Sequence, residues 1–161
     1  MAEHRITLTV NGVDHEVVVP SRLTLADALR EELDLVGTHV GCEHGVCGSC
    51  TVLIDGEPAR SCTVLAATVD GCAVRTVEGL ATNGELGPVQ RAFRDHHGTQ
   101  CGFCTPGFLM TLEALLSGDR PPSDEELRDA LAGVLCRCTG YIGVLAAAEA
   151  AVQARYGAVE Q

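Results

Sequence analysis

Cysteines are the residues of this sequence whose type and spacing are suited to chemistry. Nine of the 161 residues are cysteine, and eight of these nine form two groups of four. The first group has the spacing C-x4-C-x2-C-x11-C and begins in the segment GCEHGVCGSC at residues 41–50. Three thiolates followed by a distant fourth at this spacing are typical of a plant-type [2Fe–2S] cluster. The predicted ligands are Cys42, Cys47, Cys50 and Cys62.

Glycines occupy three further positions in the same segment, Gly41, Gly45 and Gly48. A cluster held by four thiolates is anionic, so its sulfurs need N–H donors from a backbone that approaches closely. Glycine permits positive φ and carries no Cβ that would block this approach. We therefore predict that the loop wraps around the cluster and donates hydrogen bonds that help to set the reduction potential.

The second group of cysteines consists of two pairs, Cys101-x2-Cys104 and Cys136-x-Cys138. Each pair precedes a predicted helix, and Thr105, followed by proline, is a typical N-cap residue. Residues two apart cannot share one helix face, so the second pair is predicted to lie in extended backbone. Both helix N-termini would then point at one site, where their positive ends favour an anionic group. The spacing indicates a second [2Fe–2S] cluster, with a structural zinc ion as the alternative.

Other candidate ligands are weaker. Zinc is also an alternative for the first group, but zinc fingers favour paired C-x2-C units over three ligands in one loop. Cys42-Glu43-His44 resembles half of a Rieske motif, yet no C-x-x-H follows, so His44 is predicted to be a loop residue. The remaining histidines, His96 and His97 included, lack ligand spacing. Cys72, the ninth cysteine, is predicted to be a buried and unreactive thiol in a strand.

The composition excludes several functions. A formal net charge of −11 argues against nucleic acid or an anionic membrane as partner. No apolar stretch is long enough to insert into a membrane, and the N-terminus lacks a signal region, so a cytoplasmic protein is expected. In that reducing compartment the cysteines favour metal binding over disulfides. Phosphate-binding motifs, dinucleotide motifs and a nucleophile–base pair are missing too, which indicates electron transfer for another protein.

The elements that position the first cysteine group follow an α+β pattern. Apolar and polar residues alternate over residues 4–10, Asn11-Gly12 is a strong hairpin turn, and the alternation continues on a return strand. Thr24 opens a helix with a capping-box-like Asp27. A strand, a turn at Asp55-Gly56 and further strands follow the cysteine loop. The pattern predicts a β-grasp-like, plant-type ferredoxin domain over residues 1–78.

From about residue 86 onwards the periodicity becomes helical. Apolar residues of TPGFLMTLEALLSG are predicted to lie on a single helix face. Ser123 and Glu126 form a capping box for a third helix, and a fourth starts near residue 140. Four short helices predict an all-α four-helix bundle over residues 79–161 that carries the second cluster.

The segments GCEHGVCGSCTVLIDGEPARSC, QCGFCTPGFLM and LCRCTGY resemble the small iron–sulfur subunit of the molybdenum hydroxylases. This is the family of xanthine oxidase and carbon monoxide dehydrogenase, and the resemblance covers nearly the whole chain. It implies a β-grasp domain and a four-helix domain with one [2Fe–2S] cluster each. In this family a separate large subunit binds molybdopterin and hydroxylates the substrate. The resemblance therefore implies an oxidoreductase subunit that relays single electrons from the molybdopterin site to FAD, usually in a medium subunit, or to another acceptor.

The resemblance also implies roles for individual residues. It assigns the first cysteine group to an outer cluster and the second group to an inner cluster, nearer to molybdenum. Gln100 and Cys138 match positions that contact the pterin cofactor, and a glutamine side chain supplies both a donor and an acceptor. Many relatives have Asn where Val134 stands and Gln where Ile142 stands, which affects hydrogen bonding around the inner cluster.

The assembly and the substrate are less constrained by the sequence. A dimer of heterotrimers is common in the family and is the expected assembly. The substrate is left open, because its specificity would lie in the molybdenum subunit. A free-standing two-cluster ferredoxin-like carrier is the alternative function, and co-purification with a large molybdenum subunit would distinguish the two. A zinc-stabilised interaction module is a third interpretation, for which the purified protein would be colourless.

Overall fold

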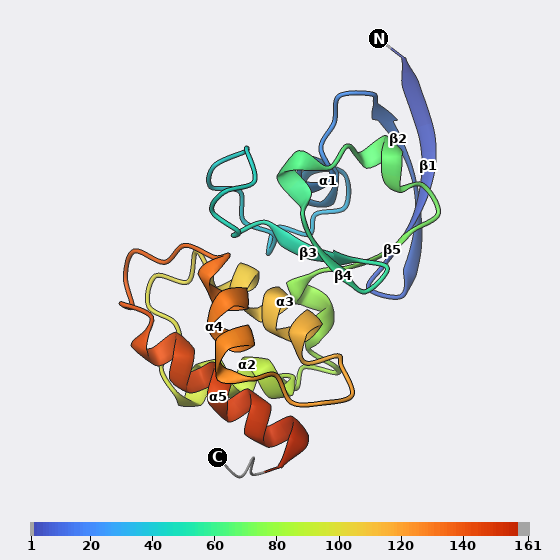
Figure 1. Ribbon diagram of the computed structural model, residues 1–161. Coiled ribbons are helices and arrows are strands. Elements are labelled where there is room, and N and C mark those ends of the chain that lie inside the picture. Colours follow the sequence, from blue (N-terminus) through green and yellow to red (C-terminus); the bar gives the residue numbers. More distant parts are fainter. Residues whose placement is uncertain (1, 158–161) are drawn as a thin grey trace.

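A five-stranded sheet forms the N-terminal half of the computed structural model, which describes residues 2–157 (Figure 1). The strand order is β2-β1-β5-β3-β4. β1 and β5 pair in parallel, whereas the other neighbours are antiparallel. This arrangement confirms the α+β class. The strands are β1 (Glu3–Val10), β2 (Val13–Pro20), β3 (Thr51–Ile54), β4 (Glu57–Arg60) and β5 (Ala73–Arg75).

The hairpins form where the sequence predicts them. In β1 the alternating residues Ile6, Leu8 and Val10 are buried, which directs the other face of the strand outwards. Asn11 and Gly12 both have positive φ, 53° and 83°, as a two-residue hairpin turn of this kind requires. The turn at Asp55-Gly56 repeats this geometry, with φ of 50° and 91°.

A short helix covers the sheet. It consists of α1 (Leu25–Asp27) and a π-helical turn over Ala28–Glu32. Thr24 starts it as predicted: its Oγ1 accepts a hydrogen bond from the Asp27 backbone N–H at 3.1 Å and donates one to Asp27 Oδ2 at 2.7 Å. Leu25 and Leu29 are fully buried and join the core of the sheet. Three short 3₁₀ turns complete this half, Ser61–Thr63, Ala66–Val69 and Val77–Leu80.

Four helices follow in the C-terminal half. The capping box of α4 is present as predicted, because the Ser123 N–H donates to Glu126 Oε2 at 2.8 Å and the Glu126 N–H donates to Ser123 Oγ at 3.2 Å. The predicted N-cap of α3 is wrong by one residue. Cys104 is the N-cap and Thr105 is already helical, since the Phe108 N–H bonds to the Cys104 carbonyl. The helices are α2 (Pro88–Asp95), α3 (Thr105–Leu115), α4 (Asp124–Ala132) and α5 (Ile142–Tyr156).

Helix α3 lies between the sheet and the other helices (Figure 1). The prediction of a single apolar face is too narrow, because α3 buries every residue from Pro106 to Leu112. Its N-terminal turn also contacts the loop 41–50: a Cβ added to Gly107 would lie 2.4 Å from the carbonyl oxygen of Gly48. A helix enclosed on all sides reads as uniformly apolar instead of amphipathic.

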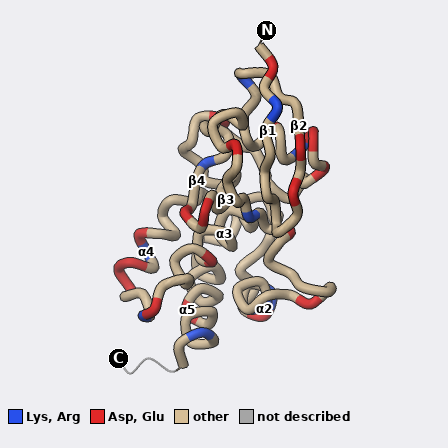
Figure 2. Tube along the Cα trace, turned by 90° about the vertical axis from the view of Figure 1, so that its right-hand side faces the viewer, with Lys and Arg blue, Asp and Glu red and all other residues tan. Residues whose placement is uncertain are grey.

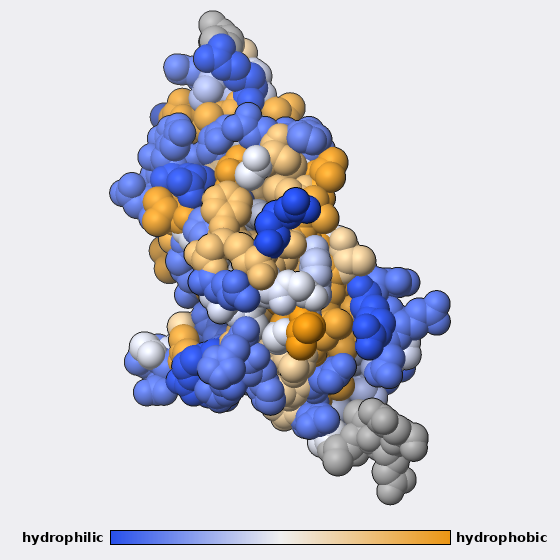
Figure 3. All heavy atoms as spheres, turned by 90° about the vertical axis from the view of Figure 1, so that its left-hand side faces the viewer, coloured by the Kyte–Doolittle hydropathy of each residue, from blue (hydrophilic) through white to orange (hydrophobic). Residues whose placement is uncertain are grey.

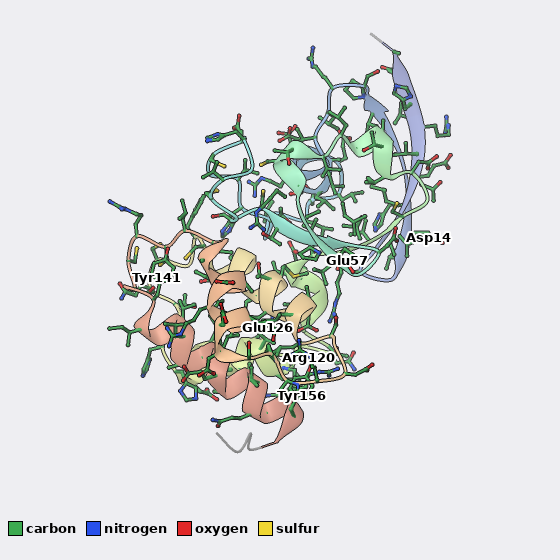
Figure 4. The ribbon with its side chains drawn as sticks, in the orientation of Figure 1. Asp14, Glu57, Arg120, Glu126, Tyr141 and Tyr156 are labelled. Carbon is green, nitrogen blue, oxygen red and sulfur yellow. The ribbon has the colours of Figure 1, made fainter. Side chains whose placement is uncertain are left out.

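Two hydrophobic cores correspond to the two halves. One lies between the sheet and α1, and the other lies among the four helices and includes Leu53 from β3. At the far end of the helical half, the Tyr156 hydroxyl is directed at the carbonyls of Leu116 and Gly118, at 3.0 and 2.7 Å, and joins α5 to the end of α3 (Figure 4).

The surface is acidic, with 22 Asp and Glu against 11 Lys and Arg in the sequence, and acidic residues lie on both halves (Figure 2). Within residues 2–157, none of the helices has the length and apolar character needed to cross a bilayer.

Candidate metal centres

The first cysteine group comes together where the loop 41–50 meets the 3₁₀ turn after β4. The Cys47 N–H lies 3.4 Å from Cys42 Sγ. Cys62 lies beside Cys50 and within electrostatic range of Cys42. The Ser61 hydroxyl donates to the Cys50 carbonyl at 2.7 Å and so fixes the 3₁₀ turn to the loop. The loop therefore presents two half-buried thiols, and the other two, Cys50 and Cys62, are buried.

Backbone N–H groups of this loop are directed at the sulfurs. Hydrogen bonds from the N–H groups of Cys47 and His44 lower the pKa of the Cys42 thiol to about 6. Burial, with Cys50 next to it, raises the pKa of Cys62 to about 11, although the Gly45 N–H acts in the opposite direction. Metal ligands must be deprotonated, so iron binding here releases protons. The set of donors is that expected around an anionic cluster.

The glycines of the loop serve two different purposes. A Cβ on Gly41 would lie 3.1 Å from Phe103 Cε1 and 3.3 Å from Cys47 Sγ, so this glycine allows close approach of both the site and the helical half. Gly45 has φ of 82°, which fits the predicted close wrapping of the site. At Gly48 the three nearest atoms all belong to the helical half. A Cβ there would lie 2.3 Å from the carbonyl oxygen of Gly133, so its missing side chain makes room for the other half of the protein.

The second cysteine group lies where α3 and α5 begin. Cys101 and Cys138 are exposed and their sulfurs are 3.5 Å apart. Cys104 and Cys136 are both buried, and burial together with the neighbouring Cys136 raises the pKa of Cys104 to about 12. The pair at 136 and 138 lies in irregular, non-helical backbone, as the spacing requires.

Two residues that the sequence did not single out hold Cys136 in place. Burial raises the pKa of the Cys136 thiol, but hydrogen bonds from the hydroxyl and the N–H of Thr139 outweigh it and bring the pKa to about 7. The Tyr141 hydroxyl accepts from the Cys136 N–H at 2.9 Å and is 3.4 Å from the Val134 carbonyl, to which it donates. Tyr141 has φ of 65° and is the residue from which α5 starts (Figure 4). In the sequence, the signal for Thr139 is the Cys-Thr dipeptide at residues 138–139, which repeats the one at residues 104–105.

The pairing of the sulfurs is informative about the kind of centre. Within residues 2–157, no three His, Cys, Asp or Glu side chains converge on one point as ligands of a single metal ion. Electrostatic contacts connect all members within each group, but the direct thiol–thiol contacts join Cys42 with Cys47, Cys50 with Cys62, Cys101 with Cys138 and Cys104 with Cys136. A zinc ion needs its ligands around one centre, whereas a [2Fe–2S] cluster takes two from the protein at each iron. The donor set fits two binuclear clusters better than two zinc ions.

The other predicted residues lie in different environments. Gln100 is exposed beside the exposed Cys101, His44 lies in the loop as predicted, and His96 and His97 are exposed. Cys72 is predicted to be a buried thiol in a strand, but it lies directly before β5 and is half-buried. Burial together with Asp55 raises its pKa. Of the two positions that depart from many relatives, Val134 is fully buried and Ile142 is 79% exposed.

Known families match both parts of the chain. A family described as "2Fe-2S iron-sulfur cluster binding domain" matches residues 8–96, and one described as "[2Fe-2S] binding domain" matches residues 76–149. The caffeine dehydrogenase subunit gamma of Pseudomonas sp. (strain CBB1) is 57% identical over 148 residues, which are 90% of this chain and 89% of that protein. The nicotine 6-hydroxylase small subunit of Paenarthrobacter nicotinovorans is 54% identical, over 84% of this chain and 82% of that subunit.

Solved structures share the fold. A chain of quinoline 2-oxidoreductase from Pseudomonas putida 86 superposes with a TM-score of 0.87 at 48% identity, over 95% of this chain and 98% of that one. The aldehyde oxidoreductase from Desulfovibrio desulfuricans ATCC 27774 has a TM-score of 0.88 at 39% identity. That match covers 93% of this chain but only 17% of the other, so the same unit also occurs inside a longer polypeptide.

Proposed function

The chain belongs to the small iron–sulfur subunits of the molybdenum hydroxylase family, and we propose that it relays single electrons from the molybdopterin site of a large subunit to FAD or another acceptor. The observation that carries this proposal is the presence of two separate groups of four cysteines, each joined pairwise and surrounded by hydrogen-bond donors. Substrate oxidation releases two electrons, whereas each cluster accepts one at a time, so two clusters in series form a relay.

We propose that Cys42, Cys47, Cys50 and Cys62 hold the outer cluster, and that the remaining paired cysteines hold the inner one. When bound, each [2Fe–2S] cluster supplies a one-electron redox centre whose potential depends on hydrogen bonds, burial and charge. The contacts support Cys42 with Cys47 and Cys50 with Cys62 as the two pairs of the outer cluster. They support two similar pairs for the inner cluster, Cys101 with Cys138 and Cys104 with Cys136.

The division into domains is part of the same proposal. We assign residues 1–78 to a ferredoxin-type domain and residues 79–161 to a helical domain with the architecture of a four-helix bundle. The two hydrophobic cores support this boundary. Cys50 and Cys62 lie in a small third cluster with Ala26, apart from both cores.

We propose that the large subunit docks on the side that carries both cysteine groups. Hydrophobic residues extend across both halves on this side (Figure 3). Four large apolar residues close to the cysteines in the sequence are strongly exposed, between 47% and 79%: Val46, Phe103, Leu135 and Ile142. Exposed apolar residues in one region mark interaction sites. Gln100 and Cys138 are exposed, and we propose that both contact the pterin cofactor of the large subunit.

Family membership supports three further parts of the proposal. An FAD-binding medium subunit accepts the electrons, the assembly is a dimer of heterotrimers, and the complex is cytoplasmic, where free thiols persist. The relatives are named for caffeine and nicotine, and a structural match for quinoline. These names support a nitrogen heterocycle as the substrate of the large subunit.

The test is the metal content and the spectrum of the purified complex. We expect about four irons per small subunit and two distinct paramagnetic signals after full reduction. Cys104→Ser should remove one signal and block electron exit while substrate still binds, whereas Cys72→Ser, the matched control, should keep both signals. Clearly fewer irons, a single signal, or an intact pair of signals in Cys104→Ser would contradict the proposal. Purification without any large subunit would favour the free carrier.

A further inference from the structure

The two cysteine loops touch each other through the backbone. The Leu135 N–H donates a hydrogen bond to the Cys47 carbonyl oxygen at 2.9 Å. Leu135 directly precedes Cys136, so one hydrogen bond and a short stretch of main chain join a cysteine of the first group to a cysteine of the second. Within residues 2–157 this is the backbone hydrogen bond that links the two loops.

Arg60, the last residue of β4, supports this contact with hydrogen bonds from the side of the sheet. Its Nη2 donates to the Gly133 carbonyl at 2.8 Å, and its Nη1 donates to Thr51 Oγ1 at 2.5 Å. The Thr51 hydroxyl in turn donates to the Gly48 carbonyl at 2.6 Å. One guanidinium group thus holds carbonyls of both loops, one directly and the other through Thr51.

The two loops pack closely against each other next to Arg60. A Cβ on Gly133 would lie 2.9 Å from Arg60 Nη2, and a Cβ on Gly48 would lie 3.0 Å from Val134 Cα. Arginine suits this position because its planar fork donates in two fixed directions, which lysine cannot reproduce. The guanidinium therefore has a defined place between two closely packed loops.

We propose that Arg60 is a positioning residue for electron transfer between the two halves: it keeps the loops in the register that closes the hydrogen bond from Leu135 to Cys47. The inference rests on the proposed ligand roles of Cys47 and Cys136. With both clusters bound, the step would transfer one electron from the inner centre, which would be oxidised, to the outer centre, which would be reduced, without a bond change or a co-reactant. Loosening of Arg60 would open this contact and weaken the coupling between the centres.

The experiment compares variants in the purified complex. Arg60→Met removes both hydrogen bonds and keeps a long apolar side chain, Arg60→Lys keeps one donor, and Thr51→Val interrupts the link to Gly48. The control is Arg75→Met, since Arg75 pairs with Glu113 at 3.0 Å and joins the two halves away from the cysteine loops. Two properties are measured: hydrogen–deuterium exchange of the segment around Leu135, and the magnetic interaction between the two reduced centres.

We expect Arg60→Met to speed exchange at Leu135 roughly tenfold, as the loss of charge-assisted hydrogen bonds implies, and to reduce the magnetic interaction. Arg60→Lys should show a smaller change, and Arg75→Met should match the wild type in both. If both variants, Arg60→Met and Thr51→Val, leave the exchange rate and the magnetic interaction unchanged while both signals are present, that result would overturn the role of Arg60 but not the ligand assignment. If Arg60→Met does not assemble into the complex, the result for Thr51→Val decides whether the inference holds. A wild type with fewer than two signals would instead contradict the ligand assignment.

Discussion

Thr139 is a hydrogen-bond donor to Cys136. Its Oγ1 lies 3.1 Å from Cys136 Sγ, and the same oxygen accepts the Tyr141 N–H at 3.1 Å. A metal ligand must be a thiolate, which can only accept, so the hydroxyl proton of Thr139 points at the sulfur. The Thr139 N–H approaches the same sulfur at 3.4 Å. Cys136 thus receives two donors from one residue.

The first prediction follows from these donors. Hydrogen bonds to a ligand sulfur stabilise the reduced, more negative state of a cluster, so their loss lowers the reduction potential. Thr139→Val should lower the potential of the inner centre by roughly 20–60 mV, the equivalent of one hydrogen bond in a one-electron couple. The measurement is a redox titration that follows the two paramagnetic signals separately.

Thr139→Ser is the matched control, because it keeps the hydroxyl and should leave the potential close to that of the wild type. The signal of the outer centre should not move in either variant, since Thr139 contacts none of its four cysteines in the described structure. An equal shift of both signals would mean a general change of structure and would refute the local explanation.

The second prediction concerns pH. The hydrogen bond from Arg120, together with the Ser123 N–H, lowers the pKa of Glu126 to about 2 (Figure 4). A carboxyl whose pKa is lower in the folded than in the unfolded state stabilises the fold above its ordinary pKa, and this contribution is lost as the pH falls towards 2. Glu126→Gln should therefore lower the Tm by a few degrees at pH 7. The difference from the wild type should stay constant down to about pH 5 and then shrink.

Glu125→Gln is the control for this experiment. It makes the same change of charge in the first turn of α4, next to Glu126 but outside its capping box. Thermal unfolding between pH 8 and pH 4 should show little effect for it. A deficit of Glu126→Gln that grows as the pH falls would contradict the assigned sign.

Local patterns made a large part of the fold predictable. The turns at Asn11 and Asp55 depend on neighbouring residues alone, and so do the caps at Thr24 and Ser123. The two cysteine groups were also visible, because metal-ligand spacing within a loop is a local property. For these features the sequence next to the residue contains the physical cause.

Contacts between the halves were not predictable in the same way. Arg60 and Gly133 are 73 positions apart in the sequence, and nothing near Arg60 indicates its acceptor. The burial of α3 on all sides depends on the sheet that packs against it, so its periodicity suggested one face only. The N-cap of α3 is Cys104 instead of Thr105, because the Cys104 carbonyl at the edge of the cysteine site accepts the Phe108 N–H and the helix begins one residue earlier. Tertiary packing decides these cases.

The third prediction tests the docking surface. Ile142 is 79% exposed at the first position of α5. Ile142→Asp places a negative charge at a helix N-terminus, where it is tolerated, so the chain itself should fold normally. If the large subunit covers this residue, the charge should weaken its association roughly tenfold or more. Affinity co-purification and analytical ultracentrifugation measure this.

Val13→Asp provides the comparison, because Val13 is also exposed, at 57%, but lies in the β1–β2 hairpin away from both cysteine loops (Figure 1). It should retain the large subunit. If both variants bind the large subunit as tightly as the wild type, the docking site lies elsewhere on the surface.

The last prediction separates the two reasons for a glycine at position 48. Gly48 has φ of 75°, which disfavours any other residue, and a Cβ there would also lie 2.3 Å from the Gly133 carbonyl. Gly56→Ala has only the cost of the unfavourable φ, which is 91° at this position. It has no clash, because no atom lies within 4 Å of the added Cβ. A residue forced into positive φ costs about 1 kcal/mol or more, whereas a clash with backbone cannot be relieved by a side-chain rotation. Gly48→Ala should therefore lower the Tm clearly further than Gly56→Ala and should speed hydrogen exchange at Leu135. Equal Tm values for the two variants would show that the loops separate easily, and that the close contact of Gly48 with Gly133 is not required for stability.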